Sequence, residues 1–149
     1  MMAGIAAHGL CKGSDTVTDG VRVAVTPAYE AWQQEPSLSA ESGAHGHHVF
    51  SYRIVILNGS DRRVQLLRRR WLIIDSDGGQ DVVEGDGVVG DQPVLEPGES
   101  YEYGSWCRLA TDWGTMEGRY EMVADGGATL SVKIGRFFLV AEPNDALEG

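Results

Sequence analysis

The residues with the most recognisable chemistry in this sequence form a glycine triplet of the GxGxxG type, Gly85, Gly87 and Gly90. In dinucleotide-binding proteins such glycines close a strand and open a helix, whose N-terminal amides bind a pyrophosphate. Here Pro93 follows three residues after Gly90, so we expect a turn and a short strand instead of a helix. The candidate ligand loop comprises Gly85, Asp86, Gly87 and Gly90.

Successive amides in a glycine turn form a concave site for phosphate even without a helix. The surrounding carboxylates oppose that use, because each one within a Debye length of roughly 8 Å repels an approaching polyphosphate. We therefore favour a structural role for the glycines, which permit positive φ and close backbone contact, over polyphosphate or nucleotide binding. The acidic residues in and beside the motif are Asp81, Glu84, Asp86 and Asp91.

Acidic side chains in the same region also provide oxygen ligands of the kind that magnesium or calcium accepts. The candidate set is Asp75, Asp77 and Asp86, with Asp81 and Glu84 nearby. Their spacing is not that of an EF-hand loop. A charged hairpin that protects an edge strand is the commoner explanation, so a divalent-cation site is the alternative.

Three histidines, His45, His47 and His48, form a second candidate metal site. Imidazole nitrogens suit cobalt, nickel or zinc. Histidines on a glycine-containing loop are also typical of an exposed tract without a specific ligand, and both interpretations stay open.

The candidates for nucleophilic catalysis are Cys107, several serines and the four histidines, but neither a nucleophile elbow nor a family-specific cysteine signature surrounds any of them. We expect Cys107 to be a small buried hydrophobic residue. Pairs of carboxylates abound because the whole chain is acidic, so their number does not indicate a tuned acid and base. We therefore expect no enzyme activity and no cofactor.

Trp106, Trp113 and Arg108 form the candidate interaction surface. Tryptophan and arginine are favoured in the hot spots of protein interfaces. Alternation along a strand places Trp106 on the face opposite Tyr103, which we expect in the core. The hypothesis of a protein partner therefore depends mainly on the two tryptophans.

The basic run Arg68, Arg69 and Arg70 does not predict one charged stripe, because strand alternation puts Arg69 on the other face from its neighbours. We expect these arginines to pair with carboxylates of neighbouring strands, in preference to a dedicated ligand role.

From residue 21 onward, apolar and polar side chains alternate with a period of two, in segments separated by turn clusters at fairly regular spacing. These segments are the strands that we expect to carry the candidate residues. We expect seven or eight mostly antiparallel strands in about 120 residues, which is typical of an immunoglobulin-like or fibronectin type III-like β-sandwich. The clearest segments are 21–32, 50–57, 64–75, 101–109, 116–122 and 130–134.

Two of these segments carry more specific expectations. Pro27 suggests an edge position, because proline cannot donate to a β-ladder. Trp71 and Ile73 share one parity and Leu72 and Ile74 the other, so we expect this strand to be central and covered on both faces.

The chain of 149 residues predicts one domain, 21–143, between a flexible leader, 1–20, and a tail, 144–149. No apolar run approaches the roughly 20 residues of a membrane helix, and the N-terminus lacks the features of a secretory signal. Cys11 and Cys107 give no disulfide framework and no metal-ligand spacing. We therefore expect a cytoplasmic protein.

The net charge is −10, from 22 acidic and 12 basic residues. Such a field repels nucleic-acid phosphates and anionic lipids, so we expect neither nucleic acid nor membrane as a partner. A protein partner and a divalent cation stay open, as does the oligomeric state.

Several segments, in consistent order over about 21–143, carry a family resemblance. They are 64–71 (VQLLRRRW), 85–93 (GDGVVGDQP), Leu95, Pro97, Gly98, Tyr101, Tyr103, Met116, Gly118 and Tyr120. Together they resemble the ApaG domain family. The resemblance implies a fibronectin type III-like sandwich, found as a small bacterial protein and as a module of eukaryotic F-box and polymerase-interacting proteins.

In that family the domain is taken for a protein-interaction module without an established enzyme activity. The family name reflects genetic proximity to a diadenosine tetraphosphate hydrolase, and a second name reflects an association with cobalt and magnesium homeostasis. Neither name defines a chemistry, and the alternative function is binding of a divalent cation, a polyphosphate or a nucleotide. This chain departs from the family at 105–109, where Trp106 replaces the usual glycine and Arg108 the usual proline. The resemblance thus implies an altered surface around Trp106.

Overall fold

The computed structural model describes residues 12–34 and 46–142, and all regular elements in these ranges are β-strands. The prediction of an all-β fold is confirmed. None of the described residues belongs to a helix that is long and apolar enough to cross a membrane. The strands are β1 (Ser14–Thr18), β2 (Val21–Gln34), β3 (Gly46–Asn58), β4 (Val64–Asp75), β5 (Gln80–Asp86), β6 (Val94–Leu95), β7 (Ser100–Leu109), β8 (Trp113–Ala124) and β9 (Thr129–Val140).

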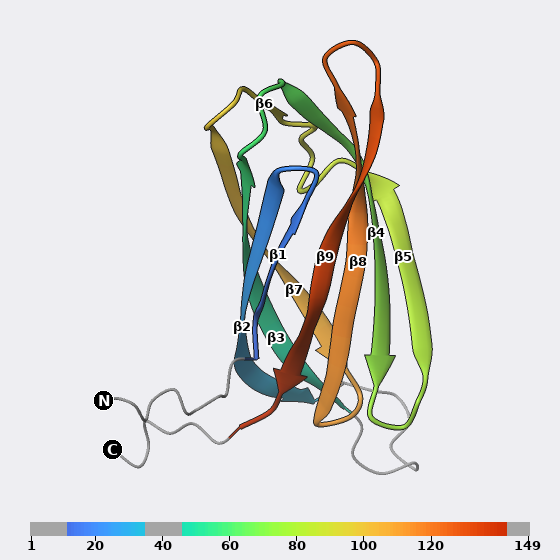
Figure 1. Ribbon diagram of the computed structural model, residues 1–149. Helices are drawn as coiled ribbons and strands as arrows, with labels where there is room; N and C mark the ends of the chain where they lie inside the picture. The colour runs from blue at the N-terminus through green and yellow to red at the C-terminus, as the bar shows by residue number, and fades with distance from the viewer. Residues whose placement is uncertain (1–11, 35–45, 143–149) are drawn as a thin grey trace, which may run out of the picture.

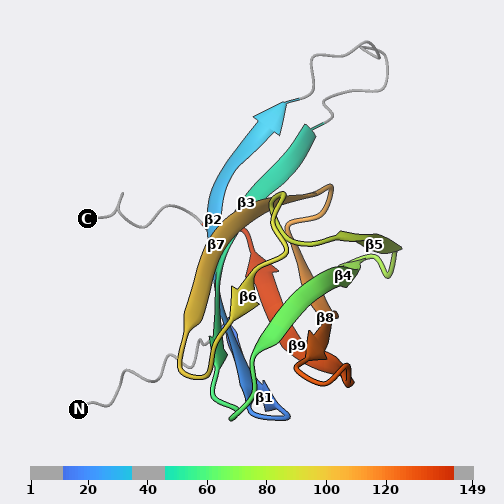
Figure 2. The ribbon, with the colours of Figure 1, turned by 90° about the horizontal axis from the view of Figure 1, so that it is seen from above.

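The strands form two antiparallel sheets packed face to face (Figure 1). The first sheet has the order β1-β2-β3-β7, and the second has the order β5-β4-β8-β9, with β6 paired to β4. Seen from above, β2, β3 and β7 form one layer and β4, β8 and β9 the other (Figure 2). This arrangement is the fibronectin type III-like sandwich that the sequence predicts.

The core lies between the sheets and follows from strand alternation. Phe50 and Ile54 of β3 are fully buried, as their parity predicts. Three aromatic rings from both sheets, those of Tyr52, Trp71 and Phe137, meet with centroids 5.6 to 5.9 Å apart. Tilted and edge-to-face contacts of this kind add about 0.5–1.5 kcal/mol each beyond the burial of apolar area.

β4 has the predicted bounds and is central in its sheet, between β5 and β8. The prediction that both of its faces are covered is wrong. Trp71 is buried, whereas Leu72 and Ile74 are half-buried, because a sandwich of two layers places nothing over the outer face of a sheet. Apolar side chains of both parities therefore do not require burial on both faces.

A β-bulge in β4 determines which of its arginines faces inward. The register with β8 shifts between Leu66 and Arg68. One extra residue reverses the parity of the following side chains, so Leu66 and Trp71 both face the core although their numbers differ in parity. Arg69 shares the inward parity of Trp71, and Arg68 and Arg70 face outward.

The expected leader extends too far into the domain, because Ser14–Thr18 forms β1. The sequence does not predict this strand, because it is short and polar and shows little alternation of apolar and polar side chains, as is common at a sheet edge. With β1 and the two-residue β6, the described residues hold nine strands instead of seven or eight. The remaining leader residues 1–11 and the tail 144–149 lie outside the described residues.

One lateral side of the sandwich is closed by contacts between β1 and β9. Ser14 Oγ donates to the carbonyl oxygen of Gly135 at 2.8 Å, and the amide of Lys133 donates to Thr18 Oγ1 at 3.1 Å. β1 pairs with β2 only as far as Val25. From Val21 to Val25, β2 therefore lies between β1 and β3. Pro27 lies past the end of β1, where β2 is an edge strand and the missing N–H of the proline leaves no ladder bond unmade.

Candidate functional site

The glycine motif forms a tight turn after β5. The amides of Val88 and Asp91 each donate to the other residue's carbonyl oxygen at 2.8 Å. Val89 and Gly90 between them have φ values of 39° and 86°. Positive φ at both central residues is typical of a type I′ turn that joins two strands.

The amides of this turn are bound within the chain. The amide of Gly87 donates to the carbonyl oxygen of Leu67 at 2.8 Å. The amides of Val88 and Asp91 are likewise engaged, since each donates to the carbonyl oxygen of the other residue. Gly87 has a φ of 62°, and a Cβ there would lie 2.3 Å from the carbonyl oxygen of Asp91. The geometry thus gives the glycines a structural role and does not direct these three amides at an anion.

Arg69 holds the glycine turn against β4. Its Nη1 donates to the carbonyl oxygens of Asp86 at 3.0 Å and Gly87 at 2.8 Å. A Cβ on Gly85 would lie 2.9 Å from Arg69 Nη2, so this glycine leaves room for the guanidinium. Sequence reasoning missed the role of Arg69, because the bulge and the partner carbonyls carry no sequence signal.

The other two arginines of the run pair with carboxylates, as expected from the sequence. Arg68 Nη1 lies 2.7 Å from Asp86 Oδ1, and Arg70 Nε lies 2.8 Å from Glu84 Oε2. Both pairs connect β4 to β5 on the outer face and are partly exposed. Such pairs contribute roughly 0–1 kcal/mol each.

The predicted carboxylate set is not brought together. Asp75 and Asp77 lie at the β4–β5 turn, where Asp75 Oδ1 accepts the amides of Asp77 at 2.9 Å and Gly79 at 2.8 Å. Asp86 ends β5 at its other end, roughly 20 Å along the strand at ~3.3 Å per residue, and binds Arg68. Among residues 12–34 and 46–142, no three His, Cys, Asp or Glu side chains gather as metal ligands would.

The histidine set is divided as well. His45 lies outside the described residues. His47 and His48 are neighbours in β3, so their side chains point to opposite faces of the sheet. The Nδ1 atom of His48 is hydrogen-bonded to Tyr29 Oη at 3.0 Å, and its ring packs against Trp32 with centroids 4.8 Å apart. His48 therefore belongs to an aromatic cluster at the end of the β2–β3 hairpin.

Trp106 and Arg108 lie together on the outer face of β7. Alternation directs their side chains away from the core, and both are exposed. Val49 of β3 lies opposite Arg108 in the register, and Trp106, Arg108, Val49 and Gln33 line one depression. Trp113 begins β8 with outward parity, so it lies on the outer face of the other sheet. The predicted surface is thus divided between two faces.

Cys107 is buried between the sheets, as expected from the sequence. Burial, with a smaller effect from the carboxylate of Asp81, raises the pKa of the Cys107 thiol to about 11. The reactive form of a cysteine is the thiolate, so Cys107 is poorly suited to nucleophilic chemistry near neutral pH.

Two tyrosine hydroxyls form a hydrogen-bonded pair inside the core. The Oη atoms of Tyr103 and Tyr120 are 2.6 Å apart. Burial raises the pKa of both hydroxyls above the usual value, and the bond lets two polar groups lie in an apolar interior. The sequence places both rings in the core, but it does not reveal that residues 17 positions apart meet through their hydroxyls.

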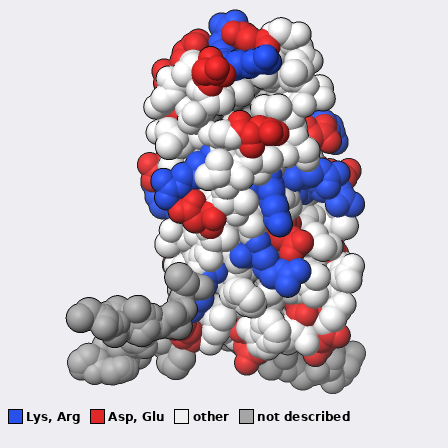
Figure 3. Space-filling view, in the orientation of Figure 1, with Lys and Arg blue, Asp and Glu red and all other residues white. Residues whose placement is uncertain are grey.

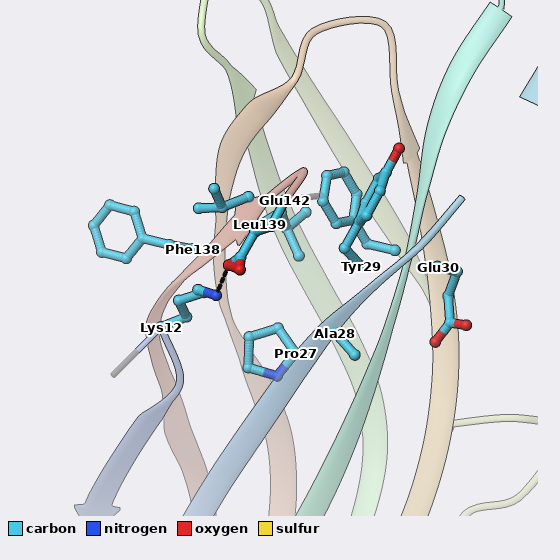
Figure 4. A pocket seen from close by; sticks show the side chains of 10 residues that line it. Lys12, Pro27, Ala28, Tyr29, Glu30, Phe138, Leu139 and Glu142 are labelled. Carbon is cyan, nitrogen blue, oxygen red and sulfur yellow. Dashed lines mark hydrogen bonds and ion pairs between the residues drawn. The ribbon is translucent and has the colours of Figure 1, made fainter. Parts of the chain in front are cut away.

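A pocket of about 280 Å³ lies at the end of the sandwich, between β2 and β9 (Figure 4). Its apolar walls include Pro27, Phe50 and Leu139, and an ion pair between Lys12 and Glu142 lies on one side. The sequence does not predict this pocket, because its walls include Lys12, from the expected leader, and Glu142, which follows the last strand.

Charges of both signs are interspersed on the face shown in Figure 3. Several exposed arginines pair with carboxylates, at distances of 2.5 to 3.0 Å. These pairs are Arg22–Asp15, Arg53–Glu102 and Arg136–Glu117. Figure 3 likewise shows no single acidic patch on the face that it draws.

Known proteins resemble this chain over most of its length. The family model described as ApaG domain matches residues 38–124. A protein named Protein ApaG from Anaeromyxobacter sp. (strain K) is 43% identical over 127 residues, which cover 85% of this chain and 94% of the relative. A Brucella canis protein of the same name is 44% identical over 123 residues, covering 83% and 89%.

A solved structure supports the same relationship. A crystal structure of a Bordetella pertussis protein superimposes with a TM-score of 0.69 at 37% identity, and the match covers 87% of this chain and 96% of that protein.

Proposed function

Given that the chain belongs to the ApaG domain family, we propose that it acts by binding another protein, and not by catalysis, through the outer face of β7. The binding site is the Trp106 surface, which consists of Trp106, Arg108 and Val49. The observation that carries the proposal is the 64% exposure of Trp106, the highest of the large apolar side chains in the described residues. An exposed indole in the middle of a regular strand offers a partner much apolar area with few rotatable bonds.

Arg108 supports this proposal because its charge is available. The other outward arginines of this sheet are engaged, since Arg22 pairs with Asp15 and Arg53 with Glu102. Within the described residues, Arg108 makes no ion pair. A guanidinium beside an exposed indole is a combination that is enriched where interfaces concentrate their binding energy.

Two features of the interior favour binding over catalysis. Burial keeps the thiol of Cys107 protonated, and the hydroxyls of Tyr103 and Tyr120 bond to each other. These potentially reactive groups are therefore engaged in packing the sandwich.

An affinity purification from cells of the source organism tests the proposal, with the wild-type chain, Trp106→Ala and Trp113→Ala as baits. Trp113 is a matched control, because it is 45% exposed but lies on the other sheet. We expect a partner that the wild type and Trp113→Ala retain equally and that Trp106→Ala loses. Equal recovery by all three folded baits would contradict the proposal.

A further inference from the structure

The two sheets end in four strands, and one of these edges is left uncovered by the residues that the structure describes. β1 and β9 cover each other through the bonds of Ser14 and Thr18. β5 is short and carries three carboxylates, a common protection of an edge. The start of β7 is covered where Tyr101 Oη donates to Asp91 Oδ2 at 2.9 Å. The remaining segment, 104–109, has one charged residue and no proline, and we call it the free β7 edge.

Two hydrogen bonds fix which backbone groups of β3 face each neighbour. The amide of Asn58 donates to the carbonyl oxygen of Glu99 at 2.9 Å, towards β7. The amide of Gly59 donates to the carbonyl oxygen of Gly20 at 2.8 Å, towards β2. Because this direction alternates along an antiparallel strand, every second residue of β3 from Asn58 back to His48 faces β7.

Residues opposite each other in an antiparallel pair direct their backbone groups either both towards or both away from one another. The register therefore gives the directions in β7, because His48 lies opposite Leu109 and Ile54 lies opposite Tyr103. The residues whose N–H and C=O groups point to β3 are thus Tyr101, Tyr103, Ser105, Cys107 and Leu109. Those whose backbone groups point to the free edge are Glu102, Gly104, Trp106 and Arg108.

Within the described residues, the free β7 edge therefore presents backbone donors and acceptors that no other backbone group binds, and they belong to the residues that also carry the Trp106 surface. The thiol of Cys107 makes one long contact with this edge, 3.9 Å from the carbonyl oxygen of Arg108. We propose that the partner binds by adding an extended strand to the free β7 edge, with a carboxylate of that strand against Arg108. This inference rests on the proposed function and names its binding mode. Main-chain bonds would supply affinity, and alternate side chains of the added strand would supply specificity.

The outer side chains of such a strand lie beside Trp106 and Arg108. The indole of Trp106 favours an apolar side chain, and the guanidinium of Arg108 favours an acidic one. Its inner side chains face the gap between the sheets, where β5 contributes Val83, which is 41% exposed. An acidic residue on the outer face and an apolar one on the inner face therefore define the expected peptide.

Gly104 permits a variant that blocks strand addition and leaves the side chains of the surface in place. Its amide points to the free edge, so Gly104→Pro removes that donor without removing a bond to β3. A Cβ at this position would lie 3.5 Å from the nearest atom, the carbonyl oxygen of Tyr52, which is ordinary contact. Gly104→Ala is the matched control, because it adds the Cβ and keeps the amide.

The test uses a displayed library of random linear peptides selected on the wild-type chain, followed by titration of the recovered peptides. We expect peptides that contain Asp or Glu, bind the wild type and Gly104→Ala equally, and bind Gly104→Pro and Arg108→Glu about tenfold or more weakly. In the complex, the amides of Gly104, Trp106 and Arg108 should become slow to exchange with solvent.

The outcomes separate the two proposals. Peptides that require Trp106 but bind Gly104→Pro as well as the wild type, without slowing those amides, would overturn strand addition and leave the proposed function standing. Peptides that bind Trp106→Ala unchanged would contradict both, and so would a library that yields no binder. If Gly104→Pro fails to fold, the amide exchange of the wild-type complex decides the question.

Discussion

Arg69 Nη1 lies 2.8 Å from the carbonyl oxygen of Gly87, and this hydrogen bond ties the glycine turn to β4. The same atom also binds the carbonyl oxygen of Asp86. A motif that suggests phosphate chemistry is thus stabilised by a cation that binds backbone carbonyls.

Replacing Arg69 should destabilise the fold more than replacing its neighbour. Arg69→Ala removes a charged donor from two carbonyls, and we expect a loss of about 1.5–3 kcal/mol in the free energy of unfolding. Arg70→Ala removes only a partly exposed ion pair with Glu84 and should cost about 1 kcal/mol or less. Urea unfolding of both variants measures the difference, and equal losses would mean that Arg69 does not hold the turn.

Two glycines of the turn should differ in their tolerance of alanine. Gly90→Ala meets no atom within 4 Å, so the strain of its positive φ should cost about 1 kcal/mol. Gly87→Ala adds a contact of 2.3 Å with the carbonyl oxygen of Asp91, and should lower the free energy of unfolding by at least about 2–3 kcal/mol. If Gly87→Ala were the milder change in chemical denaturation, the described turn geometry would be incorrect.

The buried tyrosine pair should make the protein unstable in alkali. Burial raises the pKa of Tyr103 and Tyr120 above the usual 10.0 in the folded state. Above pH 10 the unfolded chain releases protons that the folded chain retains. The contribution of the two tyrosines to the free energy of unfolding is therefore fully present below pH 10 and is lost as the pH rises above it. In the double variant Tyr103→Phe/Tyr120→Phe this fall should be shallower. An equally steep fall in denaturation curves across this range would assign the effect to other groups.

The thiol of Cys107 should react slowly in the folded protein. Its pKa rises from 9.0 to about 11, so near neutral pH the thiolate fraction should fall about 100-fold, before any effect of restricted access. In a Cys11→Ser background, iodoacetamide should therefore modify the denatured chain at least about 100-fold faster than the native chain. Similar rates in both states would show that Cys107 is accessible and ionised.

The sequence predicts the fold well, because the sandwich follows from local alternation. β4 has the predicted bounds, and Phe50 and Ile54 are buried as their parity predicts. β1 was missed because a short polar edge strand lacks an apolar face. The cover expected over both faces of β4 was wrong because a half-buried leucine on the outer face, Leu72, cannot be told from a buried one by sequence alone.

The candidate sites were harder to predict, because they depend on contacts between strands. Asp75 and Asp86 are close in sequence, but Asp75 ends β4 at the turn into β5, whereas Asp86 ends β5 at the far end of that hairpin. Trp106 and Trp113 are also near in sequence, yet the chain passes from one sheet to the other between them. The inward position of Arg69 depends on a single bulge.

A photo-cross-linking residue placed at position 106 tests most directly whether the Trp106 surface binds a protein. An aromatic photo-reactive amino acid replaces Trp106 in one variant and Trp113 in another, and both are irradiated in living cells of the source organism. We expect a discrete cross-linked species from position 106 that position 113 does not give. No cross-linked species at position 106, or the same species at both positions, would contradict it.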